Sequence, residues 1–189
     1  MFKDKKMAAV GILSVSLFLL LLALTTPGTA SAASAYFIKI DGIPGASIDD
    51  KHPGWIVAAS WSVGVTQPVT AGTPAGRVPK FQDFKFTKMT DKASPKLFVA
   101  CADGTHIREV LLEVCRADAD KVKFFEIKLS NVIVSGFSNS GSAQAYPMEE
   151  ISLNYGRIEV RYLEQRRADG TGGGTIAGGW DLTLNKPIR

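Results

Sequence analysis

The chain holds little of what enzymes and metal proteins use for chemistry. Its 189 residues include only two histidines and two cysteines. No serine lies in a G-x-S-x-G elbow, and no H-E-x-x-H pair occurs. Residues 172–177 formally fit G-x-G-x-x-A, but a dinucleotide site needs a βαβ unit around that pattern, and the chain ends soon afterwards. We therefore predict a protein that is not an enzyme and carries no cofactor.

Charge of one sign is also scarce. Lysine and arginine number 22 against 18 aspartates and glutamates, and the first 32 residues hold three of the lysines and one of the aspartates. Residues 33–189 therefore carry 19 basic and 17 acidic side chains, a formal charge of +2. A balance this even leaves no electrostatic footprint for nucleic acid or for an anionic membrane surface, so neither is expected as a partner.

A long apolar run occurs once, near the N-terminus. Three lysines at the start precede an apolar run over 7–24, and Pro27-Gly28 breaks the helix before the small residues Ala30-Ser31-Ala32. This order is typical of a secretory signal peptide that spans 1–32 and is cleaved before Ala33. The alternative is an uncleaved anchor, since a spanning helix needs about 20 apolar residues. Either way, the remainder is predicted to be secreted or periplasmic, with a membrane contact only through the leader.

The two cysteines, Cys101 and Cys115, leave two alternatives open. In an oxidising compartment they can pair and close a short loop, which is worth about 3 kcal/mol in the chain-entropy model. Otherwise they are two free thiols, at least one of them buried. Pairing depends on a Cα separation that the sequence does not give.

Neither histidine comes with the neighbours that a metal site needs. His52 follows Asp49-Asp50-Lys51, but adjacent carboxylates in a loop point in different directions, and no second histidine or cysteine lies at ligand spacing. We therefore predict a solvated loop at His52 and no metal. His106 follows the expected helix, where a cation near the last carbonyls is ordinary capping. Glu149 and Glu150 begin a strand on opposite faces, so they cannot act as an acid–base pair.

What the chain does have is alternation of apolar residues with a period of two. The segments that alternate in this way are 36–40, 55–66, 81–90, 107–116, 121–137, 151–162 and 180–184. Strands at this short spacing, with one helix between them, predict a mainly β domain over 33–189. We expect a compact barrel or sandwich of two antiparallel sheets with one short α-helix packed alongside.

Two local features of this fold are predicted from single residues. Ser94 suits the N-cap of the helix, Pro95 its first position and Gly104 its left-handed end. In the last long strand the apolar positions are odd-numbered up to Tyr155 and even-numbered after it. We predict a β-bulge at Gly156, because one extra residue flips the inward face and glycine tolerates the backbone.

Six segments, taken in chain order, resemble the Hcp family, the haemolysin-coregulated tube proteins of type VI secretion. They read FIKIDGIPGASIDDKH at 37–52, ASWSVGV at 59–65, FTKMTDKASPKLFVACADGTHI at 86–107, FEIKLSNVIVS at 125–135, EEISLNYGRIEVRYLEQ at 149–165 and GGWDLTLNKP at 178–187. Together they cover essentially all of the chain after the leader. The resemblance implies a structural protein whose hexameric rings stack into a tube. In the family a contracting sheath expels this tube, and its lumen can carry small effector proteins.

The resemblance also assigns roles to individual residues. Ser62 corresponds to the small residue inside the family's W-S-W element, which looks toward the lumen, although the second tryptophan is Val63 here. The loop over 42–52, with Asp49, Asp50 and His52, is similar to the extended loop that helps rings contact their neighbours. Cys101 falls where family members also place a cysteine in the helix, which supports a buried thiol.

One departure from the family sets up a second hypothesis. Typical members have no leader, because they assemble in the cytoplasm and leave through their own machine. An exported chain would reach the periplasm away from the cytoplasmic sheath. The alternative function is therefore an exported binding module that works in the periplasm or outside the cell without a contractile sheath. If the start codon is misassigned, assembly is cytoplasmic and the tube role follows.

Overall fold

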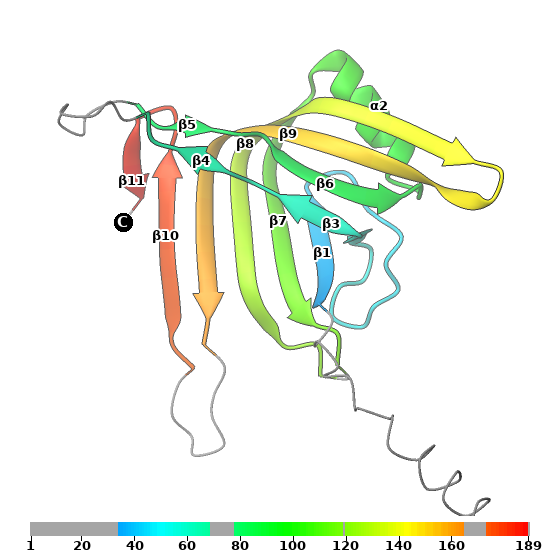
Figure 1. The fold of residues 1–189 in the computed structure, drawn as a ribbon, viewed down its shortest axis with the longest axis horizontal. Helices are drawn as coiled ribbons and strands as arrows, with labels where there is room; N and C mark the ends of the chain where they lie inside the picture. Colours follow the sequence, from blue (N-terminus) through cyan, green and yellow to red (C-terminus); the bar gives the residue numbers. More distant parts are fainter. Residues whose placement is uncertain (1–33, 69–77, 119, 165–172, 189) are drawn as a thin grey trace, which may run out of the picture. The chain divides into compact units, whose positions relative to one another are not determined.

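The computed structural model describes residues 34–68, 78–118, 120–164 and 173–188, so the predicted leader over 1–32 lies outside the described residues. The described part consists of antiparallel strands and one helix (Figure 1). The helix is α2 (Ser94–Asp103). The strands are β1 (Ser34–Ile40), β2 (Ile56–Ala58), β3 (Ser60–Ser62), β4 (Val65–Thr66), β5 (Lys80–Phe81), β6 (Phe84–Met89), β7 (His106–Arg116), β8 (Lys123–Ser142), β9 (Ala145–Leu163), β10 (Thr175–Asp181) and β11 (Lys186–Ile188).

Two layers share the long strands β8 and β9. Strands β11, β10, β9, β8, β7, β1 and β2 lie side by side in that order, while β6 pairs with β9 and β3. Along β9, residues 148–153 pair with β6, whereas residues 157–163 pair with β10. Figure 1 shows β8 and β9 running along the larger sheet and bending over into the layer that holds β6. The predicted mainly β fold with two antiparallel sheets and one short helix is confirmed.

The bend in β8 and β9 has a different origin from the predicted bulge, and the bulge at Gly156 is wrong. The two strands keep one register from Phe125↔Tyr162 to Val134↔Leu153, and the shift comes later, between Val134 and Gly136. Opposite Gly156 lies Asn131, which has a φ of 55°, and a Cβ on Gly156 would lie 3.1 Å from the Asn131 Cβ. A left-handed residue beside a glycine lets both strands change their inward face together.

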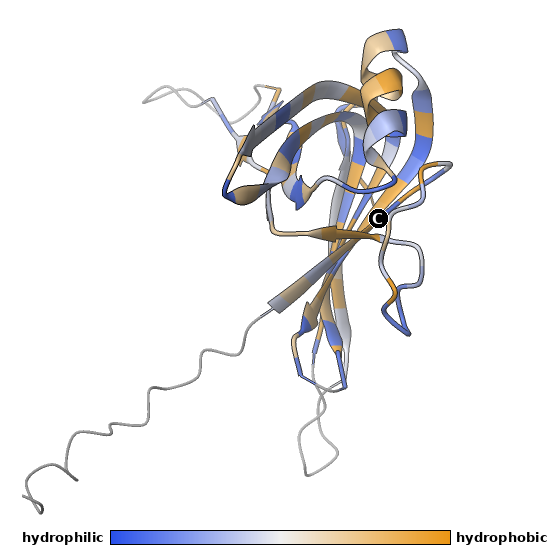
Figure 2. Ribbon diagram, turned by 90° about the vertical axis from the view of Figure 1, so that its right-hand side faces the viewer, coloured by the Kyte–Doolittle hydropathy of each residue, from blue (hydrophilic) through white to orange (hydrophobic). Residues whose placement is uncertain are grey.

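The main core lies between the layers and under the helix. Figure 2 shows the alternation of hydrophobic and hydrophilic residues as bands along the strands. Strands β1, β2, β6, β7, β8 and β9 contribute their inward-facing residues, and the largest fully buried apolar side chains are Phe84, Phe86, Ile38, Ile56, Leu97, Leu112, Ile127, Leu129, Ile151 and Leu153. Because these residues come from strands of both layers and from α2, the core joins the two layers and the helix.

The helix begins one residue earlier than predicted and ends as predicted. Ala93 occupies the N-cap without a side-chain cap hydrogen bond, and Ser94 is already helical. The Ser94 hydroxyl is engaged elsewhere, because it donates to Glu149 Oε2 at 2.8 Å. Gly104 ends the helix with a left-handed φ of 69°. The Ser94 hydroxyl oxygen also accepts from Lys88 Nζ at 2.9 Å and from the Asp91 amide at 3.0 Å, so both of its lone pairs are used and it does not accept from a helix amide.

A second, smaller buried layer lies on the other face of the larger sheet. Phe37 on β1 and Cys115 on β7 are 5% and 0% exposed, yet neither belongs to the main core cluster. On β7, Val110, Leu112 and Val114 face the main core, so Cys115 is out of phase with that set. The segment between β1 and β2, residues 41–55, covers this layer.

Candidate functional site

Residues 41–55, which we call the anchored loop, fold back on themselves before they return to the sheet. The Gly45 and Gly54 amides donate to the carbonyls of Gly54 and Ser47 at 2.8 Å each, and the Ser47 amide donates to Trp55 O at 2.9 Å. Gly45 has no space for a side chain, because a Cβ there would lie 2.3 Å from the Trp55 carbonyl oxygen. The loop is therefore a defined structure and not an open excursion of the chain.

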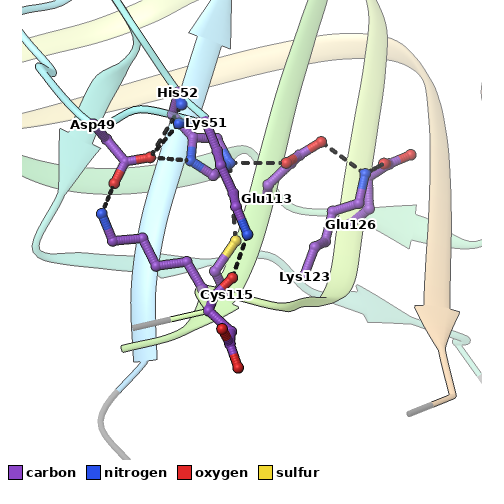
Figure 3. A network of polar contacts seen from close by, with 9 residues as sticks. Asp49, Lys51, His52, Glu113, Cys115, Lys123 and Glu126 are labelled. Atoms are coloured by element: carbon purple, nitrogen blue, oxygen red, sulfur yellow. Dashed lines mark hydrogen bonds and ion pairs between the residues drawn. The ribbon is translucent and has the colours of Figure 1, made fainter. Parts of the chain in front are cut away.

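His52 fixes this loop to the sheet, and the prediction that it lies in solvent is wrong. The residue is 3% exposed. Its Nδ1 lies 2.9 Å from Asp49 Oδ1, and its Nε2 lies 3.0 Å from Glu113 Oε2 on β7. The imidazole stacks on Phe37 with ring centres 4.0 Å apart, and the edge of Trp55 meets it at 5.0 Å. Figure 3 shows the imidazole between the two carboxylates.

A line of ion pairs extends from the histidine in both directions. Lys121 pairs with Asp49 on one side. On the other side, Lys123 Nζ donates to Glu113 Oε1 and to Glu126 Oε2, both at 2.7 Å. Arg161 on β9 then donates to the second oxygen of Glu126 at 3.2 Å. Side chains from the loop, β7, β8 and β9 thus form one polar network across the outer face of the sheet. Figure 3 shows the part of it from Asp49 to Glu126.

The contacts in this network change the pKa values of its members in a consistent way. The hydrogen bond from Lys121 holds the pKa of Asp49 well below its usual range, with further hydrogen bonds from His52 and the Lys51 amide. The same contact with Asp49 raises the pKa of Lys121. Burial by itself would lower the pKa of Lys123, but hydrogen bonds to its two glutamates outweigh burial and raise it. The pairs are therefore held in their charged forms.

Both cysteines are free thiols in the structure, so the disulfide alternative for Cys101 and Cys115 is not formed. Cys101 is half-buried on α2, whereas Cys115 is completely buried on β7. Cys115 Sγ lies 3.9 Å from His52 Nε2. Burial raises the pKa of the Cys115 thiol, and the charge of Glu113 raises it further. Sequence spacing misses this neighbour of His52, because 63 residues separate the two.

The structure divides the predicted ring-contact residues into two groups. The side chains of Asp49 and His52 turn inward, with 7% and 4% of their side-chain surface exposed. Asp50 points outward with 78% of its side chain exposed, and the neighbouring Ile48 is 98% exposed. Of the three predicted contact residues, Asp50 alone is thus exposed, and the ring-contact role stays a prediction for Ile48 and Asp50, which we call the loop tip.

Ser62 lies apart from the anchored loop, at the end of β3. It is exposed and pairs in register with Lys85 of β6. Its neighbour Trp61 stacks on Phe84 and Phe125, with ring centres 6.3 and 5.8 Å apart. The aromatic residue therefore faces the core and the serine faces away from it, as alternation requires. Its lumen-facing role stays a prediction.

Comparison with known proteins shows where this arrangement belongs. The family model described as "Type VI secretion system effector, Hcp" matches residues 37–162, two thirds of the chain. The chain belongs to the Hcp family. Hcp1 of Pseudomonas aeruginosa is 34% identical over 154 residues, which is 79% of this chain and 95% of that protein. The family resemblance of the six segments is thereby confirmed.

Solved Hcp structures agree in fold. Hcp1 from Salmonella typhimurium is 32% identical with a TM-score of 0.70, and the match covers 82% of this chain and 99% of that one. A type VI secretion system effector from Yersinia pestis is 30% identical with a TM-score of 0.65, covering 77% of this chain and 98% of that one.

Within the described ranges, no helix has the length and apolar character needed to cross a membrane.

This Hcp chain also contains a buried ion pair that the sequence analysis misses. Lys88 on β6 is 0% exposed and lies 2.7 Å from Glu149 Oε2 on β9, which is 1% exposed. Lys88 also donates to Asp91 at 2.7 Å and to Ser94 at 2.9 Å, so the pair ties the start of α2 to two strands. The available signal is phase, because Lys88 falls on the same face of its strand as Phe86. Glu150 is exposed, which confirms that the adjacent glutamates face opposite sides.

A further surface feature of the Hcp barrel is an apolar hollow of about 620 Å³ between β9, β10 and the β4–β5 pair. Its lining includes Val65, Phe81, Val160, Ile176 and Trp180. Ile176 is 63% exposed and Val65 is 57% exposed. Apolar hollows of this kind on a soluble protein commonly mark contact surfaces.

Proposed function

We propose that this Hcp chain is a non-catalytic subunit of a type VI secretion tube, which assembles with copies of itself into closed hexameric rings that stack. The observation that carries the proposal is the match to Hcp1 of Pseudomonas aeruginosa over 95% of that protein's length. A closed ring needs a heterologous interface, in which one surface meets a different surface on the next copy. The apolar hollow and its exposed rim supply one such surface.

The oligomeric state of the purified protein tests this proposal directly. Residues 33–189 are analysed by size exclusion with light scattering and by negative-stain electron microscopy. We expect a mass about six times that of one chain and ring-shaped particles with a central hole. A strictly monomeric species at high protein concentration would overturn the proposal.

Within the ring, we expect Ser62 to face the lumen, where small effector proteins would be carried. A gold-cluster maleimide on the Ser62→Cys variant, in a Cys101→Ser background, makes the position visible by electron microscopy. Cys115 is completely buried and should not react. Gold density in the central hole is the expected outcome, and density on the outer rim would contradict it.

Between rings, we expect contact through the exposed tip of the anchored loop. Ile48 is almost fully exposed there, which makes it the residue with most apolar surface to lose on contact. The Ile48→Asp variant should still form single rings but should lose stacked rings in electron micrographs. Leu184→Asp, also at an exposed apolar position, is the matched control. Unchanged stacking in the Ile48 variant would exclude the loop tip as the contact.

The signal-peptide pattern over 1–32 favours a second candidate, an exported binding module without a sheath. The two candidates differ in where the mature protein resides and in what surrounds its gene. Mass spectrometry of the native protein should find an N-terminus at Ala33 in the periplasm or medium if the module is right. An intact Met1 in the cytoplasm, with sheath and baseplate genes nearby, would leave the tube subunit as the function.

A further inference from the structure

Three side chains of different chemistry converge where the anchored loop meets the sheet. His52 Nε2, Glu113 Oε2 and Cys115 Sγ all lie within 4.8 Å of one another. Glu113 and Cys115 stand two residues apart on β7, so both project from the same face of that strand toward the loop. Figure 3 shows the glutamate and the cysteine reaching the imidazole from one strand. His52 and Cys115 are 3% and 0% exposed, which makes this an enclosed group of donors.

The hydrogen-bond arrangement around His52 points to a cation. Both ring nitrogens face a carboxylate oxygen, Nδ1 toward Asp49 at 2.9 Å and Nε2 toward Glu113 at 3.0 Å. A neutral imidazole has one N–H, so if Nδ1–H donates to Asp49, a lone pair on Nε2 faces a carboxylate oxygen. Something must lie between these two atoms to satisfy both of them, and a metal ion bound by the nitrogen and the carboxylate oxygen does so.

We propose that Zn²⁺ binds at this place, with His52 Nε2, Glu113 Oε2 and Cys115 Sγ as its three protein ligands and water at the fourth position. Tetrahedral zinc, with bonds of about 2.0 to 2.3 Å, places its ligand atoms roughly 3.4 to 3.6 Å apart. The separations of 3.0 Å between nitrogen and oxygen and 3.9 Å between nitrogen and sulfur lie on either side of that range. The third separation, between Glu113 Oε2 and Cys115 Sγ, is within 4.8 Å, so side-chain rotations that bring these two atoms closer would complete the site. On binding, the Cys115 thiol passes its proton to solvent and coordinates as thiolate.

The surroundings of the three ligands suit zinc in particular. A thiolate and an imidazole select borderline metals, whereas Mg²⁺ and Ca²⁺ take oxygen ligands only. Asp49 behind the imidazole orients its ring, as carboxylates commonly do for zinc-bound histidines. Lys123 Nζ donates a hydrogen bond to Glu113 Oε1, so only Oε2 of this carboxylate is available to bind the metal. Phe37 and Trp55 pack against the ring and restrict its rotation. All three ligands come from one chain, so the site is independent of ring assembly.

Metal analysis of the full purified protein tests the site. The protein is equilibrated with Zn²⁺ alone, freed of excess metal by gel filtration and analysed by mass spectrometry of the elements. We expect one zinc per chain in the unaltered protein and in Cys101→Ser, the matched control that removes the other cysteine. Cys115→Ser should lower zinc affinity at least tenfold. Asp49→Asn should lower it about 10- to 100-fold, as removal of a partner behind a ligand typically does.

A second variant separates a metal ligand from a merely structural glutamate. Glu113→Gln keeps the size of the side chain and can donate a hydrogen bond to His52 Nε2, so the metal-free fold should survive, as judged by its thermal unfolding midpoint. The variant should nevertheless lose zinc. Co²⁺ in place of Zn²⁺ should give a thiolate charge-transfer absorption that Cys115→Ser abolishes. Absence of bound zinc, cobalt binding without that absorption, or equal zinc loss in Cys101→Ser would each overturn the proposal and leave His52 as a hydrogen-bonded anchor of the loop alone.

Discussion

Tyr155 on β9 combines near-complete burial with a single polar contact. It is 3% exposed, and its hydroxyl donates to the Gln82 carbonyl at 3.0 Å. Burial, with the nearby charge of Asp83, raises its pKa to about 12. The unfolded chain titrates near pKa 10, so between these values the native state holds the proton that the unfolded state has lost. Stability from this group is therefore complete below about pH 10 and is lost as the pH rises toward 12.

Replacing Tyr155 with phenylalanine should separate the contribution of its hydrogen bond from that of its ionisation at alkaline pH. At neutral pH the Tyr155→Phe variant loses one hydrogen bond and should be about 1 kcal/mol less stable in urea unfolding. Above pH 10 its free energy of unfolding should fall less steeply than that of the unaltered protein. Tyr146→Phe, at a position that is 79% exposed, should change neither quantity. An alkaline loss of stability equal to that of the unaltered protein would contradict the assignment.

Patterns of single residues predict the inward faces well and the polar contacts poorly. Alternation is a local property, so it places Phe84 and Phe86 on the core side without knowledge of their partners. His52 owes its burial to Glu113 and Cys115, which are 61 and 63 residues away in the chain. No local pattern carries that information. Lys88 could be predicted in part. Its position on the same face of the strand as Phe86 indicates that it is buried, but its partner Glu149 comes from another strand and has no local signal.

At the scale of elements, the anchored loop depends on Gly45. Alanine there must displace backbone, because its Cβ would lie 2.5 Å from the Ile56 nitrogen and Cα. We expect Gly45→Ala to destabilise the protein by about 1–3 kcal/mol, as overpacking does, and to loosen the loop from the sheet. The measurements are the unfolding midpoint and amide hydrogen exchange over residues 41–55.

A glycine with open space around it serves as the control for this change. A Cβ on Gly178 of β10 would meet nothing within 4 Å, so Gly178→Ala should shift stability by no more than about 0.5 kcal/mol. If both alanine variants unfold at the same midpoint and exchange alike, the loop is not held as described.

The attachment of α2 rests on the buried pair Lys88–Glu149. Glu149→Gln leaves a lysine that is 0% exposed without its full negative partner. Removing one member of a buried pair typically costs about 3–5 kcal/mol, and Asp91 at 2.7 Å compensates only in part. We expect a loss in the lower part of that range by chemical denaturation.

The adjacent glutamate provides the matched comparison. Glu150 is 53% exposed and lies 3.5 Å from Lys85, a geometry that is worth about 0–1 kcal/mol at most. Glu150→Gln should therefore be close to neutral. Similar losses for the two glutamine variants would show that the interior pair contributes no more than a surface pair.

Elements differ in how far they could be predicted. The strands and the end of α2 at Gly104 follow from period and from glycine chemistry, both of which are local. The sequence of β9 shows that its inward face changes near Gly156. The cause lies in two strands at once, because the left-handed Asn131 on β8 lies beside Gly156 and both strands change face there. In the sequence of one strand the change of face looks like an inserted residue, that is, a β-bulge. The sequence does not show that the neighbouring strand changes face at the same place.

For the whole molecule, ring formation makes stability depend on concentration. Association that requires the folded state shifts the unfolding equilibrium by mass action, so the unfolding midpoint should rise with protein concentration. We expect this rise between micromolar and hundred-micromolar chain, measured by calorimetry at fixed salt. The Ile48→Asp variant, expected to stop at single rings, should retain most of the rise. A midpoint that does not change with concentration would argue against rings.

The place of β1 in the sheet has a consequence for a chain that crosses a membrane unfolded. β1 follows the predicted leader directly and pairs with β7 through all seven of its residues, Ser34 with Arg116 first. This first strand of the described part therefore waits for a partner some 70 residues behind it. Such distant pairing is slow to form and leaves a strand edge open meanwhile. A chain exported by the general secretory route would thus need a chaperone that keeps it unfolded until β7 has crossed the membrane. A chain made in the cytoplasm could pair β1 with β7 as soon as β7 leaves the ribosome.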